Sequence, residues 1–193
     1  MAMAITVPHY TIDDLANFPD DGNRYELLDG LLLVTPGASL GHQVIASRIQ
    51  ARLSNAVQST GVAYVVGPGV VVRLPNTQLQ PDILVFPSRY KPDTDWRKVT
   101  EHWLAVEVLS RSSKIYDRAF KKDAYFALGV QQVWLVDRWN KSIEVWRSPS
   151  SSKIARTTLP WHAPVGDAHK YVLEVTRSAA QASCASSLYL IAR

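Results

Sequence analysis

The sequence predicts an α/β or α+β fold, in which one mixed β-sheet is flanked by helices. The predicted elements follow one another as helix, hairpin, helix, several strands, helix and two strands, an order typical of mixed sheets. The strand candidates are short runs rich in β-branched residues, whereas the two longer helix candidates repeat apolar residues every three or four positions. With 193 residues, 47% of them hydrophobic, the chain is long enough to bury a core without disulfides.

The N-terminal elements are a short helix and a hairpin. Thr11 is a suitable N-cap for an amphipathic helix, and acidic residues follow it in the first turn. Two short apolar runs, 25–28 and 31–34, flank the dipeptide Asp29-Gly30. Because this dipeptide readily adopts the backbone of a two-residue hairpin turn, the two runs are predicted to pair.

A long helix and a second hairpin are predicted next. Residues 37–60 carry apolar side chains at helical spacing, and Gly61 provides a C-terminal stop. The β-branched runs 62–66 and 70–74 flank a Gly-Pro-Gly turn at 67–69, which predicts that these two runs pair with each other.

The second half of the chain contains the most apolar strand candidates. Residues 83–86 and 103–109 are almost wholly apolar, as expected of strands that are buried on both faces. A helix from residue 112 or 113 to residue 128 is predicted to bury one apolar stripe. The stripe consists of Tyr116, Phe120, Ala124 and Leu128. Two further strands are predicted over 133–136 and 143–147.

The last part of the chain carries weaker signals. Residues 148–152 are polar and suit a hairpin or a loop tip, whereas residues 178–187 are small and low in complexity. We expect a single domain over residues 1–193, with its chemically informative motifs within residues 8–147. The arrangement of residues 148–193 is left open.

Composition excludes several classes of protein. The single cysteine excludes a disulfide framework and a multi-cysteine zinc site, and it favours a reducing compartment such as the cytoplasm. No run approaches the ~18 apolar residues of a membrane span, so no membrane association is expected. The net charge is +4, and residues 31–193 hold 20 of the 21 basic residues but only 11 of the 17 acidic ones. This surplus suits either a polyanionic partner or an ordinary soluble surface.

Two acidic residues stand where apolar ones are expected. Glu107 interrupts the apolar run 103–109, and Asp82 directly precedes the run 83–86. A buried carboxylate is costly unless it is paired, and two neighbouring carboxylates repel unless they share a cation. A divalent metal with oxygen ligands is one explanation. Alternatively, Glu107 pairs with an arginine or lysine in the core, and Asp82 is an ordinary turn residue.

Lys121 is the third candidate for a functional role. It lies four residues after Asp117 and four before Tyr125, so the three side chains share one face of the predicted helix. Asp117 and Lys121 could form an ordinary surface ion pair. In the functional interpretation, the Lys121 ammonium reaches the two carboxylates from the helix that follows the Glu107 strand.

Five short motifs occur in the same order as in a known protein family. They are Arg24-Tyr-Glu-Leu-Leu-Asp-Gly30, Gln80-Pro-Asp-Ile-Leu-Val85, Val106-Glu-Val-Leu-Ser110, Asp117-Arg-x-x-Lys121-x-x-x-Tyr125 and Gly129-Val-x-x-Val-Trp-Leu-Val-Asp137. Together they resemble the Uma-type restriction endonuclease family, which belongs to the PD-(D/E)xK nuclease superfamily. Each motif alone is weak, whereas the ordered set is specific.

The resemblance implies a restriction-endonuclease-like mixed β-sheet core flanked by helices, and metal-dependent hydrolysis of DNA. It makes Asp82 and Glu107 the catalytic acids, which would bind Mg²⁺ or Mn²⁺ together with the backbone carbonyl of Val108. The superfamily pattern has a lysine two residues after the second acid, where this chain has Leu109. The family resemblance places the catalytic lysine on the following helix instead, at Lys121. Four further residues are expected to support the site: Glu26, His42, Asp117 and Tyr125.

The expected partner is nucleic acid, most simply DNA. Four basic residues around the third helix are candidates for contacts with DNA phosphates: Arg111, Lys114, Arg118 and Lys122. A homodimer is expected, because cutting both strands of a duplex is commonly the task of a dimer. Two alternatives stay open, a nuclease-fold binding or scaffold protein that does not cut, and an unrelated α/β protein whose two acids are structural.

Overall fold

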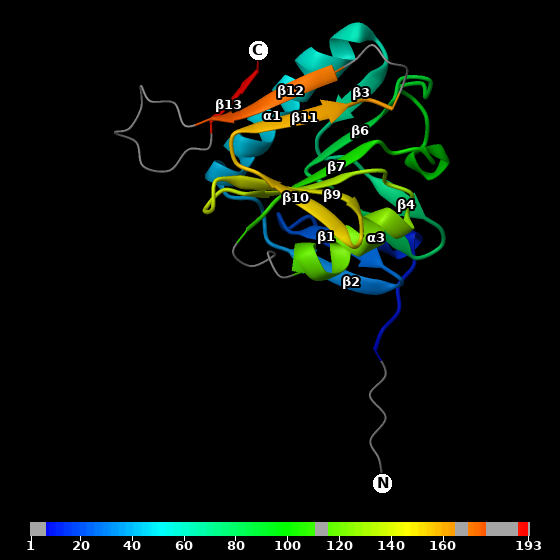
Figure 1. Cartoon of the computed structure of the whole chain (residues 1–193). Helices are drawn as coiled ribbons and strands as arrows, with labels where there is room; N and C mark the ends of the chain where they lie inside the picture. Colours follow the sequence, from blue (N-terminus) through cyan, green and yellow to red (C-terminus); the bar gives the residue numbers. More distant parts are fainter. Residues whose placement is uncertain (1–6, 111–115, 165–169, 177–188, 193) are drawn as a thin grey trace.

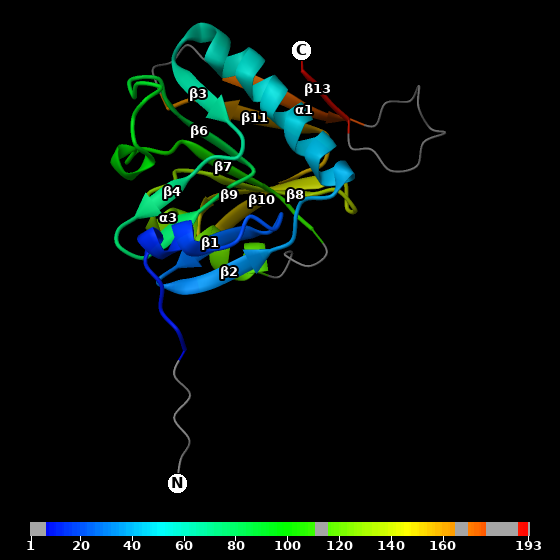
Figure 2. The same cartoon turned by 180° about the vertical axis from the view of Figure 1, so that it is seen from behind.

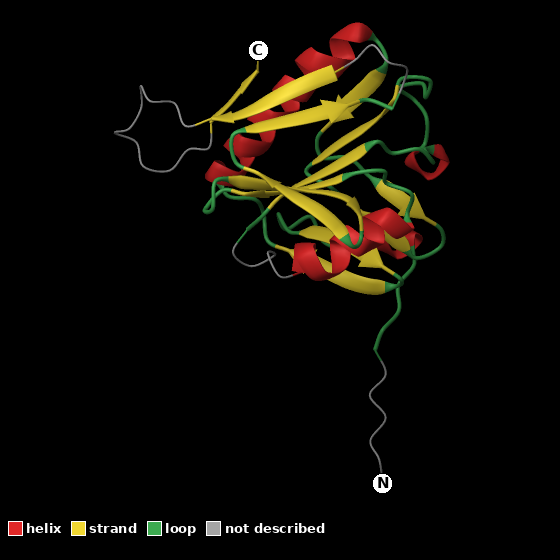
Figure 3. Ribbon diagram, viewed as in Figure 1, coloured by secondary structure: helices red, strands yellow, loops and turns green. Residues whose placement is uncertain are grey.

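The computed structural model of the chain describes residues 7–110, 116–164, 170–176 and 189–192. Its mixed α+β architecture confirms the predicted fold class (Figures 1 and 3). A six-stranded sheet forms the centre. A long helix and a three-stranded sheet cover one of its faces, and a short helix and a four-stranded sheet cover the other.

The central sheet has the strand order β10-β9-β8-β7-β6-β3. Neighbouring strands are antiparallel, except β7 and β8, which are parallel. The bounds are β3 Ala63–Val66, β6 Ile83–Pro87, β7 Leu104–Val108, β8 Val133–Asp137, β9 Ser142–Ser148 and β10 Ser151–Ala155. The strands predicted over 83–86, 103–109, 133–136 and 143–147 are confirmed, and β9 and β10 form the hairpin predicted around 148–152.

Alternation along the central strands sends their side chains into two separate cores. In β7, Leu104 and Val106 enter the core beside the long helix, whereas Ala105, like Leu109 just after the strand, enters the core beside the short helix. Successive side chains of a strand point to opposite faces, so Glu107 shares the face of Ala105. The charged position of β7 therefore lies on the side of the short helix and the four-stranded sheet.

The four-stranded sheet has the order β2-β1-β5-β4 and includes the first predicted hairpin. Its bounds are β1 Arg24–Leu28, β2 Leu31–Thr35, β4 Val71–Arg73 and β5 Thr77–Leu79. Asp29 and Gly30 have positive φ angles of 49° and 82°. A two-residue turn between twisted strands requires this left-handed backbone, which confirms the prediction from the dipeptide.

The prediction of a second hairpin, in which 62–66 pairs with 70–74, is wrong. β3 pairs with β6 in the central sheet, whereas β4 pairs with β5 in the four-stranded sheet. Gly69 explains the change of sheet, because a Cβ atom at this position would lie 2.3 Å from the Cβ of Leu84. Only glycine lets the chain pass this close to β6 on its way to the other sheet.

The long helix α1, Leu40–Val57, lies along one face of the central sheet (Figure 2). Ser39 is its N-cap, and the 3₁₀ turn η2, Gln58–Thr60, extends it to Gly61, whose φ of 75° ends the helix. The helix predicted over 37–60 is thereby confirmed. Within the described part of the chain, no helix combines the length and the apolar character that crossing a membrane requires.

The third helix buries only part of the predicted apolar stripe, at Ala124 and partly at Leu128, and it also buries a polar face beside the stripe. It consists of η4 Asp117–Lys121, a π-helical turn, and α3 Lys122–Ala127. Phe120, placed in the predicted apolar stripe, is 54% exposed, whereas Asp117, Lys121 and Tyr125 are buried. The polar face is turned inward because it meets the carboxylates of β1 and β7. The predicted start of this helix, at residue 112 or 113, lies outside the described residues.

The remaining elements lie at the periphery. They are η1 Ile12–Asn17, η3 Trp96–Lys98, β11 Thr158–His162, β12 Lys170–Thr176 and β13 Tyr189–Ala192. The predicted N-cap Thr11 is confirmed, and its backbone amide donates to the Asp14 carboxylate at 2.7 Å. The three-stranded sheet has the order β11-β12-β13. Trp161 of β11 packs edge-on against Trp134 of β8, which ties this sheet to the central one.

Candidate active site

Asp82 and Glu107 meet at one end of the central sheet. Ile83 pairs with Val106 in the antiparallel ladder between β6 and β7, so the next position along each strand places Asp82 opposite Glu107. The backbone amide of Val108 donates a hydrogen bond of 2.8 Å to Asp82 Oδ2. The two acids that interrupt the apolar pattern, 25 residues apart in the chain, are therefore neighbours in the fold.

Asp82 is a buried carboxylate surrounded by donors. His42 Nε2 lies 3.0 Å from Oδ2, and both terminal nitrogens of Arg24 lie 3.3 Å from Oδ1. Burial acts to raise the pKa of Asp82. The hydrogen bond and charge of His42, the charge of Arg24 and the Val108 amide outweigh burial and lower this pKa below its ordinary value. Asp82 is therefore ionised at neutral pH.

The Glu107 side chain is also buried, but its pKa shifts in the opposite direction. The Tyr125 hydroxyl donates to Glu107 Oε1 at 2.5 Å, and Lys121 Nζ lies 3.4 Å from the same oxygen. Burial raises the pKa of Glu107, Lys121 opposes the rise, and the nearby carboxylates of Asp82 and Asp117 add to it. The net direction of the pKa is upward, because burial together with the neighbouring carboxylates outweighs the Lys121 ammonium.

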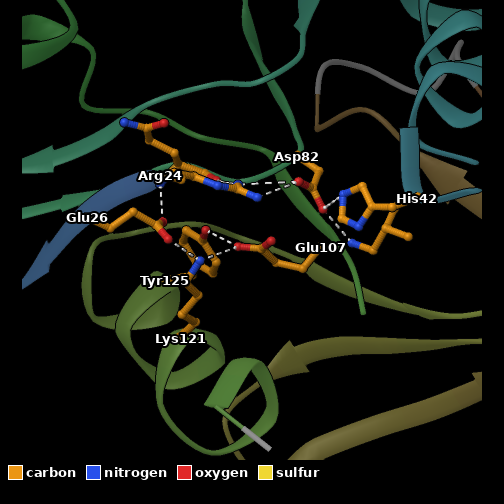
Figure 4. Close-up of polar contacts among 9 residues, drawn as sticks. Arg24, Glu26, His42, Asp82, Glu107, Lys121 and Tyr125 are labelled. Carbon is orange, nitrogen blue, oxygen red and sulfur yellow. Dashed lines mark hydrogen bonds and ion pairs between the residues drawn. The ribbon is translucent and has the colours of Figure 1, made fainter. Parts of the chain in front are cut away.

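Lys121 lies between two carboxylates that come from different strands (Figure 4). Its Nζ is 2.6 Å from Glu26 Oε2 and 3.4 Å from Glu107 Oε1, and the residue is only 3% exposed. Burial works against the charged form, but Glu107 and Glu26 raise the pKa of Lys121 above its ordinary value. The lysine is therefore held as an ammonium ion inside the protein.

Strand β1 contributes both Arg24 and Glu26, two residues apart and so on the same side of the strand. The Arg24 guanidinium donates to the backbone oxygen of Gln80 at 2.7 Å, and Glu26 Oε1 accepts from the Gln80 amide at 2.7 Å. These two contacts attach the first hairpin to the segment that carries Asp82. The hairpin thereby brings a cation to Asp82 and an acid to Lys121.

A cavity of about 320 Å³ opens onto this cluster. Asp82, Glu107 and Lys121 line it together with His42 and Asp117. Two other members of the cluster, Glu26 and Tyr125, are wholly buried, and they contact Lys121 and Glu107 from the protein interior. The three core candidates and all four supporting candidates from the sequence therefore belong to one connected cluster.

The donor set of this cavity fits a hard divalent cation. Mg²⁺ typically binds one or two carboxylates and retains several waters, and Asp82, Glu107 and the adjoining carbonyl of Val108 are oxygen donors of this kind. Four acids of the cluster face two permanent cations: Glu26, Asp82, Glu107 and Asp117 face Arg24 and Lys121. No group of three or more His, Cys, Asp or Glu side chains among the described residues could by itself hold a metal ion. A bound metal would therefore depend on two carboxylates, one carbonyl and water.

The structure describes two of the four basic residues expected to contact DNA, and both form contacts within the protein. Arg118 donates from Nε to Glu144 Oε1 at 2.8 Å and from a terminal nitrogen to Asp137 Oδ2 at 3.1 Å. It therefore ties the third helix to strands β8 and β9. Arg111 and Lys114 lie outside the described residues.

Lys122 is not part of a basic surface. It is 6% exposed, its Nζ donates to the Pro149 oxygen at 2.8 Å, and the ammonium lies 4.1 Å from the centre of the Trp146 ring. These contacts hold the hairpin of β9 and β10 against the helix. Of the four basic residues expected to contact DNA, Arg118 and Lys122 are thus engaged in contacts within the protein, and the other two lie outside the described residues.

Three residues of the site were not predicted from the sequence: Arg24, Arg138 and Trp139. Arg24 stood inside a quoted motif, and its position two residues before Glu26 in a strand was the available signal. Arg138 and Trp139 line the cavity, and the Arg138 guanidinium lies 4.5 Å from the centre of the Trp139 ring. They follow β8, whose parallel pairing with β7 brings its C-terminal end to the same edge of the sheet as Glu107.

A protein-family model matches residues 12–167, and its description is Uma2, "Putative restriction endonuclease". The chain belongs to the Uma2 family. This match confirms the family resemblance of the five sequence motifs, and it supports a nuclease function.

The architecture of this Uma2 protein is similar to that of a solved structure, a putative nuclease belonging to DUF820 from Anabaena variabilis ATCC 29413. The TM-score is 0.61 with 19% sequence identity, over 75% of this chain and 83% of that chain. At this identity the likeness concerns the fold. No curated protein matches the chain.

Proposed function

We propose that this Uma2 protein is a Mg²⁺- or Mn²⁺-dependent endonuclease that hydrolyses DNA phosphodiester bonds. The observation that supports the proposal best is the convergence of Asp82, Glu107 and Lys121 on one cavity from three different elements. A structural ion pair needs neither a second carboxylate nor a cavity. Two carboxylates around an open space can bind a metal ion, and an ammonium beside them can contact a phosphate. This combination suits metal-assisted phosphodiester hydrolysis.

Asp82, Glu107 and the Val108 carbonyl are the groups that would hold the metal. When bound, the metal would supply a Lewis acid that polarises the scissile phosphate and lowers the pKa of a water molecule. Arg24 and His42 keep the Asp82 carboxylate ionised and oriented.

Lys121 lines the same cavity as the two carboxylates and would act on the phosphate bound there. Its ammonium would offset the negative charge that develops on the phosphate, or orient the attacking water. Glu26 and Tyr125 hold Lys121 and Glu107 in place before substrate arrives, so little reorganisation is needed. Hydrolysis of this type leaves a 5′-phosphate and a 3′-hydroxyl.

The DNA backbone contacts are proposed to include Arg138 at the rim of the cavity. Its guanidinium packs on the Trp139 ring and forms no ion pair with an acid in the described part of the chain. An arginine in this state is available for a phosphate. Arg118 and Lys122 are not included, because both are held by contacts within the protein.

A homodimer is also proposed, through the outer edge of β2, which pairs with no strand other than β1 among the described residues. This strand ends the four-stranded sheet, and its Leu31 and Val34 are 43% and 51% exposed. An exposed edge strand with apolar side chains is a ready partner for a second strand. Light scattering after size-exclusion chromatography measures the mass. A dimer that becomes monomeric with Val34→Lys supports this interface, and a monomeric wild-type protein contradicts it.

Plasmid nicking tests the proposed activity. The purified protein is incubated with supercoiled plasmid in Mg²⁺, in Mn²⁺ and in EDTA, beside Asp82→Ala and Glu107→Ala. Asp93→Ala is the matched control, because Asp93 is an exposed acid outside the cavity. We expect metal-dependent nicking by the wild type and the control, and none by the two site variants. Plasmid binding without nicking in any sample would instead identify a nucleic-acid-binding protein that does not cut.

A further inference from the structure

A second cavity, of about 350 Å³, adjoins the candidate active site. Arg24 and Asp82 line both cavities, as do Gly37 and Ala38 just before α1. The two spaces therefore share a wall that contains a catalytic carboxylate. A molecule whose phosphate occupies the first cavity would place its neighbouring groups in the second.

Amide side chains characterise the second cavity. Four of its lining residues carry a primary amide: Asn23, Gln43, Gln50 and Gln80. Gln43 and Gln50 are seven residues apart on α1, nearly two turns, so they project from the same face of the helix. The side-chain amides of Gln43, Gln50 and Gln80 form no hydrogen bond with another described residue.

Gly67 keeps one of these amides close to the catalytic acid. A Cβ atom at position 67 would lie 2.9 Å from Gln50 Oε1 and 2.6 Å from the backbone oxygen of Asp82. Any larger residue would displace the Gln50 amide or the Asp82 segment. The chain therefore leaves room for an uncharged donor and acceptor group directly beside Asp82.

The chemistry of the two cavities differs. The first is lined by several acids and bases, as a metal ion and a phosphate require. In the second, the charged residues are Arg24 and Asp82, both shared with the first cavity. Uncharged amides lack the charge that strengthens contacts with phosphates, but each offers a donor and an acceptor side by side. Glutamine pairs in this way with the edge of a nucleobase, most readily with adenine.

We propose that the second cavity is a nucleobase subsite, in which Gln43 and Gln50 bind the base next to the scissile phosphate, with a preference for adenine. This subsite rests on the proposed nuclease function, which it extends from backbone hydrolysis to a base-dependent choice of cleavage position. Its volume lies within the range of about 300–1,000 Å³ that is typical of ligand sites.

Binding in EDTA tests the subsite without any cleavage. Fluorescence anisotropy measures Kd for single-stranded oligo-dA, oligo-dT and an abasic analogue of equal length. We expect the wild type to bind oligo-dA about tenfold more tightly than the abasic strand, the usual size of one bidentate amide–base pair. The Gln43→Ala/Gln50→Ala double variant should bind both strands alike, with an unchanged Kd for the abasic strand. Alanine at these helical positions favours the fold.

Gln131→Ala is the matched control, because Gln131 is an exposed glutamine that precedes β8 and does not line the second cavity. It should keep the wild-type preference. Equal affinity of the wild type for all three strands, or a preference that the double variant retains, would overturn the subsite. The nicking assay is independent, so loss of the preference in the double variant supports the subsite even if no plasmid is cut.

Discussion

The third helix presents two charged faces that contrast in their surroundings. Lys121, on the inner face, contacts Glu26 and Glu107 beside an open cavity. Lys122, the next residue, is almost as buried but contacts the Pro149 oxygen and the Trp146 ring. Two adjacent lysines with similar burial therefore have different partners. Burial of a cation does not indicate a catalytic site by itself, whereas several acids around it at the mouth of a cavity make it a candidate for one.

Arg118 extends this comparison on the outer face. Its partners, Asp137 and Glu144, hold the helix to two strands of the central sheet. Asp137 is wholly buried but also accepts hydrogen bonds from the amides of Trp139 and Asn140. The outer face is a completed network with a structural role. The inner face has an excess of acid that a divalent cation would neutralise.

The largest expected effect distinguishes the two lysines. Lys121→Met should slow plasmid nicking by about two to three orders of magnitude, the usual cost of removing one group that stabilises the transition state. Lys122→Met, with the same change of side chain, should leave the nicking rate close to that of the wild type. Rates are measured from the loss of supercoiled plasmid in Mg²⁺. Equal rates for the two variants would remove the functional distinction between the faces.

Metal binding should depend on the inner face alone. A ligand that binds only the folded state adds about 2.7 kcal/mol to the free energy of unfolding at a hundredfold excess over its Kd. We therefore expect Mn²⁺ to raise the Tm of the wild type. The rise should be smaller for Glu107→Gln, and for Glu144→Gln it should equal that of the wild type. Differential scanning fluorimetry with and without EDTA measures the shift. A full shift in Glu107→Gln would place the metal elsewhere.

The outer face should affect stability more than activity. Arg118→Met removes charged hydrogen bonds to Asp137 and Glu144, so we expect a loss of about 2 kcal/mol in the free energy of unfolding. Urea denaturation measures this loss, and Arg147→Met serves as a control at an exposed arginine. Nicking at a temperature well below the Tm should be preserved. A variant with normal stability and no nicking would assign Arg118 to the site.

The last prediction concerns the pH dependence of stability in the metal-free protein. The pKa of Glu107 rises on folding from 4.5 to about 8, so the folded state binds more protons than the unfolded state between these values. Stability should therefore fall as the pH rises through this window, by up to about 1 kcal/mol per pH unit. The lowered pKa of Asp82 makes the stability depend on pH only below pH 3.8, where stability is lost as the pH falls.

Urea denaturation in EDTA at several pH values tests this dependence, and Glu107→Gln should flatten it. A wild-type stability that rises across the same pH window would show that the partners of Glu107 outweigh its burial.

The sequence by itself determined the strand that follows Asp82 and the strand that contains Glu107, because a charge within or before a run of buried apolar residues is visible locally. It also determined the Asp29-Gly30 hairpin and the long helix, whose signals lie within a few residues. Tertiary structure decided which face of the third helix is buried, since the carboxylates that turn Lys121 and Asp117 inward come from strands β1 and β7. It also decided the partners of Asp82, the separation of β3 from β4 at Gly69, and the amide-lined cavity. Each of these depends on contacts between distant segments, and the free energy of such contacts overrides local propensity.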